Sequence, residues 1–223
     1  MIDNLYLHHH LGLGDHIICN GLVRYLLKNR VRNIILPTKK HNVESVEYMY
    51  KDLTTIKIDP VLEDKYAIKK YKEYKNVLRI GFENIKSIDW EKSFYDQVNI
   101  DYNHRFDSFF INRDKERENN FIKRFDIRKK YAFACLTSST SNSNIKLDTN
   151  LPVIFLESIT GNLFDWLPVI FNASEVHTID TSIFQLIKQL KLNCRQVFYD
   201  ISSIDRTRTN YTLDLKKWET IVI

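Results

Sequence analysis

Apolar positions in the first half of the chain form short runs that alternate between two spacings. Runs with apolar residues at neighbouring or alternate positions predict strands, and runs with a spacing of three and four predict amphipathic helices. The pattern gives strands at 6–9, 33–37, 55–59 and 76–82, and helices at 15–29, 43–51, 62–74, 91–98 and 105–111. Pro37 cannot donate to a strand ladder, so we expect it to end the second strand.

A polar segment separates this half from a second one with the same rhythm. Residues 112–120 are all polar, and we interpret them as the start of a connecting helix that runs to Phe125 and marks a domain boundary. Beyond it, the pattern predicts strands at 131–136, 152–156, 175–180 and 195–199, and helices at 163–172 and 182–190. The tail, 213–223, is expected to pack back through Trp218. Alternating strands and helices predict an α/β protein with two small, Rossmann-like, doubly wound domains.

Composition and charge narrow the class of protein further. The chain is 43% hydrophobic and 13% aromatic, which is enough for buried cores, and its net charge of +5 is too weak and dispersed to indicate nucleic acid. Cys19, Cys135 and Cys194 are far apart and show no metal-ligand spacing, so we expect buried free thiols and a reducing compartment. The N-terminus lacks a signal-peptide pattern, and no apolar run approaches the ~20 residues that span a bilayer. We therefore expect a cytoplasmic protein.

The segment 5–27 concentrates the unusual residues of the first half. It holds three of the five glycines, Gly12, Gly14 and Gly21, which indicates a tight turn or a close backbone approach. The turn delivers Asp15 and His16 to the carboxyl end of the first strand, where open α/β sheets bind ligands. The dinucleotide fingerprint is incomplete because Ile17 occupies the place of its third glycine, and a Walker-type phosphate loop is absent.

Asp15 has two interpretations that the residues alone leave open. Asp is a preferred helix N-cap, worth about 1 kcal/mol, and its charge complements the helix dipole. A carboxylate at the mouth of a sheet can also act as a base, although a helix N-terminus favours its ionised form and so weakens it.

The second half offers three groups with the same ambiguity. Asp180, Thr181 and Ser182 follow a strand and begin a helix, where unpaired N–H groups and hydroxyls can bind an anion such as phosphate, or simply cap the helix. Gly161 and Asn162 lie in a strand-to-helix connection that is either an ordinary turn or a ligand loop. The segment 137–140, which begins at Thr137, offers hydroxyls directly after a buried strand.

The four histidines near the first strand do not predict a metal site. His8, His9, His10 and His16 crowd one region, but strand alternation sends His9 to the face opposite His8 and His10. No pair of carboxylates suggests a magnesium site either. We therefore expect neither a metal ion nor another cofactor.

Two of these segments together carry a family resemblance. Leu11-Gly12-Leu13-Gly14-Asp15-His16-Ile17, followed by Leu22 and Leu26, resembles the N-terminal motif of heptosyltransferase-like glycosyltransferases of the GT-B fold, family 9. The segment His177-Thr-Ile-Asp180-Thr181-Ser182-Ile-Phe-Gln-Leu186 resembles their donor-side motif. The resemblance implies an acceptor-side domain at 1–112, a linker helix at 113–130 and a nucleotide-sugar-binding domain at 131–223, with a cleft between the two domains.

The resemblance also assigns roles to the candidate residues. Asp15 would be the general base, and Gly12, Gly14, His10 and His16 would line the acceptor side. The donor and its phosphates would be bound by Thr137, Gly161, Asn162, His177, Asp180, Thr181 and Ser182. The implied activity is metal-independent transfer of a hexosyl or heptosyl group from a nucleotide-sugar to a hydroxyl of a glycan or lipid-linked acceptor.

Two other functions remain open at this point. One is a sugar-nucleotide epimerase or hydrolase on the same scaffold. The other is a catalytically silent protein that binds nucleotide or glycan or has a structural role. The chain has Asn20 where the family usually has proline in its first helix, and Thr181-Ser182 where glycine is common.

Overall fold

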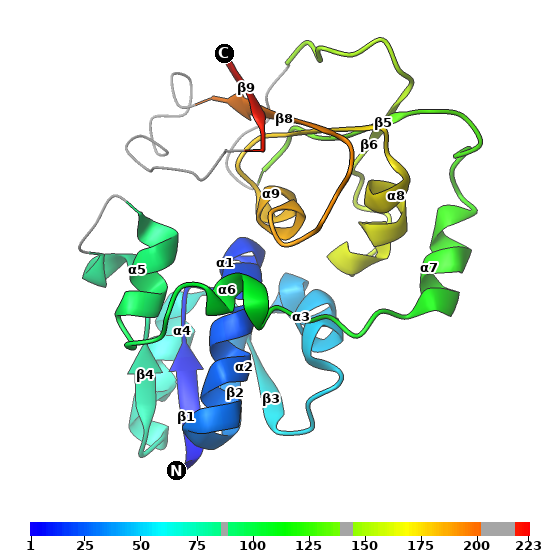
Figure 1. The fold of residues 1–223 in the computed structure, drawn as a ribbon. Coiled ribbons are helices and arrows are strands. Elements are labelled where there is room, and N and C mark those ends of the chain that lie inside the picture. Colours follow the sequence, from blue (N-terminus) through cyan, green and yellow to red (C-terminus); the bar gives the residue numbers. More distant parts are fainter. Residues whose placement is uncertain (86–88, 139–144, 202–216) are drawn as a thin grey trace. The chain divides into compact units, whose positions relative to one another are not determined.

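A computed structural model describes residues 1–85, 89–138, 145–201 and 217–223. The chain divides into two compact units, Met1–Asn112 (unit 1) and Arg113–Ile223 (unit 2), each with its own sheet (Figure 1). Every strand pair in the described residues is parallel, and helices flank both sheets. The α/β prediction is therefore confirmed.

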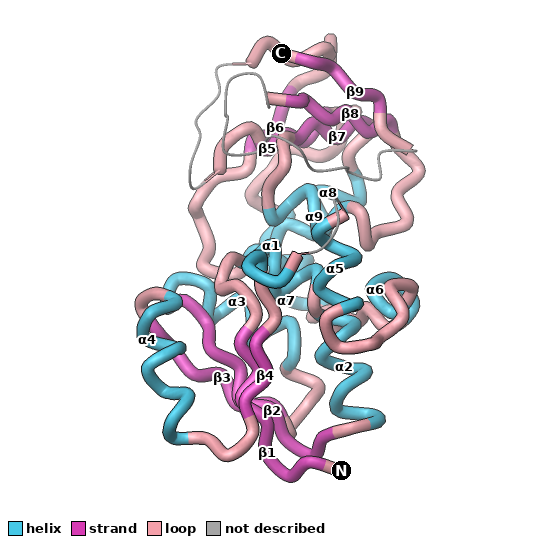
Figure 2. The backbone as a smooth tube through the Cα atoms, turned by 90° about the vertical axis from the view of Figure 1, so that its left-hand side faces the viewer, coloured by secondary structure: helices cyan, strands magenta, loops and turns pink. Residues whose placement is uncertain are grey.

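The sheet of unit 1 has the strand order β3-β2-β1-β4, and its strands lie side by side in Figure 2. The strands are β1 (Ile2–His8), β2 (Val31–Lys39), β3 (Ile56–Val61) and β4 (Val77–Arg79). The central β1 is buried from Leu5 to His8, because strands pair with it on both sides.

Pro37 does not end the second strand as predicted. β2 continues to Lys39, and Pro37 lies opposite Asp59 of β3. β1 pairs with β2 only as far as Ile35, so one edge of β2 is unpaired from that point on. A missing N–H is tolerated in a strand where one edge makes no ladder.

The helices of unit 1 follow the predicted order, but the first predicted helix is divided and the one predicted at 105–111 ends at Asp107. They are α1 (Leu13–Ile18), α2 (Asn20–Asn29), η1 (Lys40–Asn42), α3 (Val43–Tyr50), α4 (Asp64–Lys69), η2 (Lys70–Glu73), η3 (Phe82–Asn84), α5 (Trp90–Asp96) and α6 (His104–Asp107). The predicted helix at 15–29 begins two residues earlier, at Leu13, and is interrupted at Cys19.

Gly21 allows two helices of unit 1 to approach closely. A β-carbon at this position would lie 1.9 Å from the carbonyl oxygen of His104, at the start of α6. No glycine among the described residues has a positive φ. The clustered glycines were expected to allow either a tight turn or a close backbone approach, and Gly21 serves the close approach.

The sheet of unit 2 has the order β6-β5-β7-β8-β9. Its strands are β5 (Ala132–Cys135), β6 (Val153–Phe155), β7 (Glu175–Thr178), β8 (Arg195–Asp200) and β9 (Glu219–Val222). All four residues of β5 are buried, as expected for an inner parallel strand. Trp218, just before β9, packs on Phe184 with ring centroids 5.1 Å apart, which confirms its predicted packing; residues 213–216 of that predicted tail lie outside the described residues.

The helices of unit 2 are α7 (Lys115–Ile122), η4 (Leu163–Trp166), α8 (Leu167–Asn172) and α9 (Ser182–Ile187). The predicted connecting helix corresponds to α7, which belongs to unit 2. Phe121 on α7 packs against the buried Trp166, with ring centroids 5.2 Å apart. Within the described part of the chain, no helix is both long and apolar enough to cross a membrane.

Candidate functional site

The winding of each sheet reverses beside its first strand. In unit 1, β2 and β3 lie on one side of β1 and β4 on the other; in unit 2, β6 lies on one side of β5 and β7 on the other. Open α/β sheets bind ligands outside the carboxyl ends of the strands at such reversals. The candidate residues follow these strands: His10 to Asp15 after β1, Thr137 after β5, and Asp180 to Ser182 after β7.

The turn after β1 differs from its sequence interpretation. Gly12, with extended backbone angles, is the N-cap of α1, so of the two interpretations left open for Asp15, the N-cap position is excluded. Asp15 lies in the first turn of α1, and its Oδ2 is 2.7 Å from the point where Gly12 would carry a β-carbon. The missing side chain at Gly12 therefore makes room for the Asp15 carboxylate.

His8 and His10 point to groups on the elements that follow β3 and β4. His8 is buried, with Nδ1 2.5 Å from the Tyr71 hydroxyl and Nε2 3.3 Å from Asp64 Oδ1. His10 is half-buried, and its Nε2 accepts the Phe82 N–H at 3.0 Å. Burial lowers the pKa of both rings.

His9 and His16 form a separate, fully buried pair. Their rings meet edge to face with centroids 4.4 Å apart, and both side chains have 0% exposure. His9 Nδ1 lies 2.8 Å from the His10 carbonyl, which fixes the proton on Nδ1. His9 Nε2 and both nitrogens of His16 have no hydrogen-bond partner among the described residues.

Both rings of this pair are therefore held neutral. Burial lowers the pKa of His9 to about 4 and the pKa of His16 well below its usual range. The hydrogen bond to the His10 carbonyl and the charge of Asp64 oppose this lowering of the His9 pKa, while the charges of His8 and His10 add to it. Strand alternation correctly separated His9 from His8 and His10. Among the described residues, no three His, Cys, Asp or Glu side chains converge on a point that could hold a metal ion.

The three cysteines are free, as predicted. Cys19 and Cys135 are buried and Cys194 is half-buried. Burial raises the pKa of the Cys19 thiol well above its usual range, and it raises that of Cys135 to about 11. Such thiols are protonated near neutral pH, which makes them poor nucleophiles.

The start of α9 in unit 2 is closely tied to the ends of the strands. Thr181 is the N-cap, and its hydroxyl accepts the Phe184 N–H at 3.3 Å. The Cys135 thiol at the end of β5 lies 3.7 Å from the same hydroxyl. Asp180 Oδ1 accepts a hydrogen bond from Gln185 Nε2 at 3.2 Å, and Ser182, the first residue of the helix, is half-buried. Thr181 can cap the helix and contact a ligand at the same time, because a hydroxyl can accept two hydrogen bonds.

Two further candidates of unit 2 lie at the carboxyl ends of neighbouring strands. Thr137 is exposed and Ser138 is half-buried just after β5, and the other two hydroxyls of that predicted group, at 139 and 140, lie outside the described residues. Gly161 is exposed after β6, whereas Asn162 is fully buried. The Asn162 side chain accepts the Phe164 N–H at 3.1 Å and caps η4.

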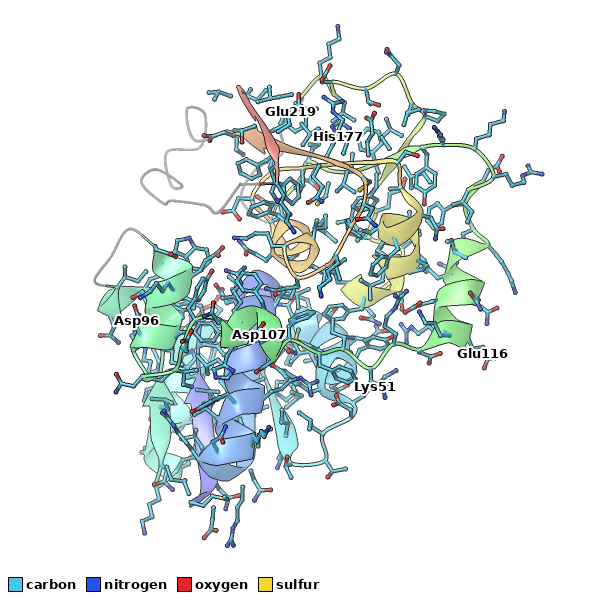
Figure 3. All side chains as sticks on the ribbon, in the orientation of Figure 1. Lys51, Asp96, Asp107, Glu116, His177 and Glu219 are labelled. Atoms are coloured by element: carbon cyan, nitrogen blue, oxygen red, sulfur yellow. The ribbon has the colours of Figure 1, made fainter. Side chains whose placement is uncertain are left out.

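His177 lies within β7 rather than at its carboxyl end. It is fully buried, with Nδ1 3.0 Å from the Tyr199 hydroxyl and Nε2 3.0 Å from Glu175 Oε2. Figure 3 shows it among the packed side chains of unit 2. Both ring nitrogens are therefore used by protein partners, and any influence on a ligand would be indirect.

Sequence reasoning missed the charged partners that hold these loops. Arg117 and Asp165 form a bidentate ion pair although they are 48 residues apart in the sequence. Asp64 contacts His8, which lies 56 residues away in the sequence. No local pattern marks such pairs, because each depends on the packing of separate elements.

Comparisons with known proteins identify the fold. The sequence matches no protein-family model, and no curated protein is significantly similar to it. A glycosyl transferase family 9 structure from Veillonella parvula DSM 2008 matches with a TM-score of 0.60 at 10% identity, covering 100% of this chain and 86% of that one. The E. coli ADP-heptose lps heptosyltransferase II matches with a TM-score of 0.55 at 10% identity, covering 99% of this chain and 90% of that one. The chain therefore has the GT-B-like fold of heptosyltransferase-like, family 9 glycosyltransferases.

Proposed function

We propose that the protein is a glycosyltransferase that moves a sugar from a nucleotide-diphosphate donor to an acceptor hydroxyl. The observation that carries the proposal is the placement of chemistry on this fold. A carboxylate, Asp15, lies at the sheet reversal of unit 1, and hydroxyls at a helix start, Thr181 and Ser182, lie at that of unit 2. The likeness to transferase structures over the whole chain supports the same activity.

The proposed step forms one bond and breaks one. The acceptor oxygen bonds to the anomeric carbon of the donor sugar, while the bond from that carbon to the phosphate oxygen breaks. The acceptor proton passes to a base, and the bonding electrons leave with the nucleoside diphosphate. The transition state resembles an oxocarbenium ion, so the leaving phosphate gains negative charge.

Asp15 is the base in this proposal. Its place in the first turn of α1 favours its ionised form, which keeps the carboxylate ready to accept a proton but makes it a weak base. Proton transfer becomes favourable as the acceptor oxygen bonds to carbon and its proton grows more acidic. Gly12, Gly14 and His10 border the same turn on the acceptor side, and His16 supports the turn from within the core.

The start of α9 receives the donor diphosphate in this proposal. Thr181, Ser182 and Thr137 supply hydroxyls, and the backbone N–H groups at the start of α9 face the growing phosphate charge. Asp180 holds Gln185 at the same helix start, and His177 supports β7 from beneath. The Gly161–Asn162 loop lets the backbone approach the nucleotide. The proposed reaction uses no metal and no cofactor beyond its nucleotide-sugar substrate.

The acceptor and the compartment are part of the same proposal. We propose a glycan or lipid-linked acceptor and a role in glycan biosynthesis. Buried free thiols suit a reducing compartment, which supports a cytoplasmic location.

A thermal-shift screen with UDP, GDP, ADP and CMP tests the donor assignment. A nucleotide at about 100 times its Kd should raise the melting temperature by about 5–10 °C. No response to any of the four would contradict both transfer and hydrolysis of nucleotide-sugars. With the responsive nucleotide's sugar conjugates, release of free sugar without an acceptor would indicate a hydrolase, and a changed sugar stereochemistry an epimerase.

A further inference from the structure

Asp165 is a buried carboxylate that collects donors from three directions. It is 4% exposed, on η4 of unit 2. Arg117 Nε and one terminal nitrogen lie 2.5 and 2.8 Å from its two oxygens. The Thr160 hydroxyl donates to Oδ2 at 2.5 Å, and Asn162 Nδ2 donates to Oδ1 at 3.1 Å. A buried carboxylate needs such partners, because leaving it unpaired is strongly destabilising.

These contacts determine the shape of the loop that follows β6. Thr160 and Asn162 flank Gly161, and both side chains end on the same carboxylate. The Thr160 hydroxyl also accepts the Asn162 N–H at 3.2 Å. The loop therefore has two polar anchors, and both depend on the position of Asp165.

Arg117 connects this loop to a different element. It projects from α7, whereas every other partner of Asp165 named above lies within five residues of it. The guanidinium orients both carboxylate oxygens at once, which a single donor does not do. Arg117 is thus the long-range contact that holds Asp165, and through it the loop.

The ion pair borders an open pocket. The pocket has a volume of about 480 Å³, and its lining includes Arg117 and Glu116 from α7, Thr160 of the loop and Asp165. Figure 3 shows Glu116 on α7, pointing away from the body of unit 2. Arg117 can therefore change or move without first breaking a sealed core.

We propose that the Arg117–Asp165 ion pair positions the Thr160–Gly161–Asn162 loop for the donor nucleotide, so that Arg117 sets nucleotide affinity without touching the ligand. This inference rests on the proposed function, which places the nucleotide beside Gly161 and Asn162. Arg117 and Asp165 are positioning residues in this scheme.

The same helix supplies a matched control. Arg113 binds Glu118 through two hydrogen bonds of 2.6 Å each, and Glu118 is also buried, at 3% exposure. The hydrogen bonds between Arg113 and Glu118 do not involve the 160–162 loop. Breaking them should cost similar stability while leaving the loop in place.

The test compares Arg117→Gln and Arg113→Gln by two measurements. Titration with the nucleotide found in the thermal-shift screen should show affinity weakened about 3- to 30-fold in Arg117→Gln and unchanged in Arg113→Gln. Hydrogen exchange of the 160–162 amides should be faster in Arg117→Gln only. Arg117→Lys, which keeps the charge but loses the two-pronged geometry, should lie between wild type and Arg117→Gln in both measurements.

The outcomes separate this inference from the proposed function. Nucleotide binding by the wild type with equal affinity in Arg117→Gln would overturn the positioning role and leave the proposed function intact. Failure of the wild type to bind any nucleotide would overturn the proposed function and the ligand part of this inference. In that case the exchange rates still decide whether the ion pair holds the loop, and equal rates in both variants would overturn that as well.

Discussion

The two sheet reversals carry buried histidines in opposite states. In the described part of the chain, three of the four ring nitrogens of His9 and His16, beneath the Gly12–Asp15 turn of unit 1, have no partner. His177, in β7 of unit 2, uses both of its nitrogens. All three side chains have 0% exposure. The same residue type is thus a neutral packing group in one unit and part of a hydrogen-bonded chain in the other.

This difference extends to the residues that face the ligand in the proposed function. The candidate groups of unit 2 are held by side-chain hydrogen bonds: Thr181 accepts the Phe184 N–H, and Asn162 accepts the Phe164 N–H and donates to Asp165. In unit 1 the turn is shaped by the absence of a side chain at Gly12 and by packing on His16. The hydrogen-bonded groups of unit 2 suit the binding of a charged donor. The packed turn of unit 1 suits the presentation of a single reactive carboxylate, Asp15.

The largest expected effect separates chemistry from binding. Asp15→Asn removes the proposed base while keeping the shape of the side chain, so turnover should fall about 10²- to 10⁴-fold with nucleotide affinity unchanged. Steady-state kinetics and nucleotide titration measure the two quantities. Asp89→Asn is the matched control, because Asp89 caps α5 in the same unit and Asn caps equally well. Full turnover in Asp15→Asn would reduce Asp15 to a structural residue.

Acid should destabilise unit 1 through the unpartnered pair. The folded-state pKa values of His9 and His16 lie below the unfolded value of 6.5, so the unfolded chain binds more protons as the pH falls below that value. Their contribution to stability is complete above pH 6.5 and, for His9, is lost between pH 6.5 and about 4. The slope is about 1.4 kcal/mol per pH unit for each histidine.

Denaturant unfolding at pH 7.5, 6.0 and 5.0 measures this slope. His16→Leu should reduce the slope of unfolding free energy against pH by the contribution of one histidine, because leucine cannot be protonated. An unchanged slope in His16→Leu would show that His16 is already protonated or hydrogen-bonded in the folded protein.

Replacing single histidines at pH 7.5 sharpens the contrast between the units. His177→Leu leaves the Tyr199 hydroxyl and Glu175 without their shared partner, and it should cost about 1–3 kcal/mol of unfolding free energy. His16→Leu breaks no hydrogen bond to any residue that the structure describes, and it should change stability by less than about 1 kcal/mol, because leucine is apolar and of similar volume. Equal losses of unfolding free energy in His177→Leu and His16→Leu would contradict the contrast between a hydrogen-bonded and a purely packed histidine.

The smallest expected effect concerns a single hydroxyl of unit 2. Ser182→Ala should weaken nucleotide binding about 3- to 10-fold, the worth of one hydrogen bond, with turnover at saturation little changed. Ser174→Ala is the control, because Ser174 precedes β7 at its amino end, away from the ligand edge. Unchanged affinity in Ser182→Ala would remove Ser182 from the donor site.

Local patterns predicted most of the fold because they report local forces. The alternation of spacings located β1 to β8, and the fully apolar run at 131–136 predicted the buried β5. It missed β9 (Glu219–Val222), because only packing through Trp218 was expected for that tail. The prediction that Pro37 ends the second strand was wrong. A proline is tolerated there because β1 stops pairing with β2 at Ile35, and the extent of that pairing cannot be read from the sequence around Pro37. The residues left the cap and base interpretations of Asp15 open, and only the observed helix start at Leu13, with Gly12 as N-cap, excludes the N-cap position for Asp15.

The candidate sites were less predictable than the strands that carry them. The chemistry-bearing residues Asp15 and Asp180 to Ser182 could be located because they lie at or beside the start of a helix that comes shortly after an apolar strand. Their supporting contacts could not, since Arg117 meets Asp165 only after α7 packs beside η4. His177 has a motif position that suggests a ligand, and only the three-dimensional partners show that its nitrogens are occupied.

The contact between Gly21 and His104 has a consequence for the genetics of this protein. A methyl group at position 21 meets backbone of α6 rather than a side chain that could turn aside, so Gly21→Ala strains unit 1 without touching either sheet edge. In cells, a loss of one or two kcal/mol changes the abundance of a protein several-fold, and heating deepens the loss. Gly21→Ala should therefore behave as a temperature-sensitive allele, depleting the protein at high growth temperature while each remaining copy keeps its activity.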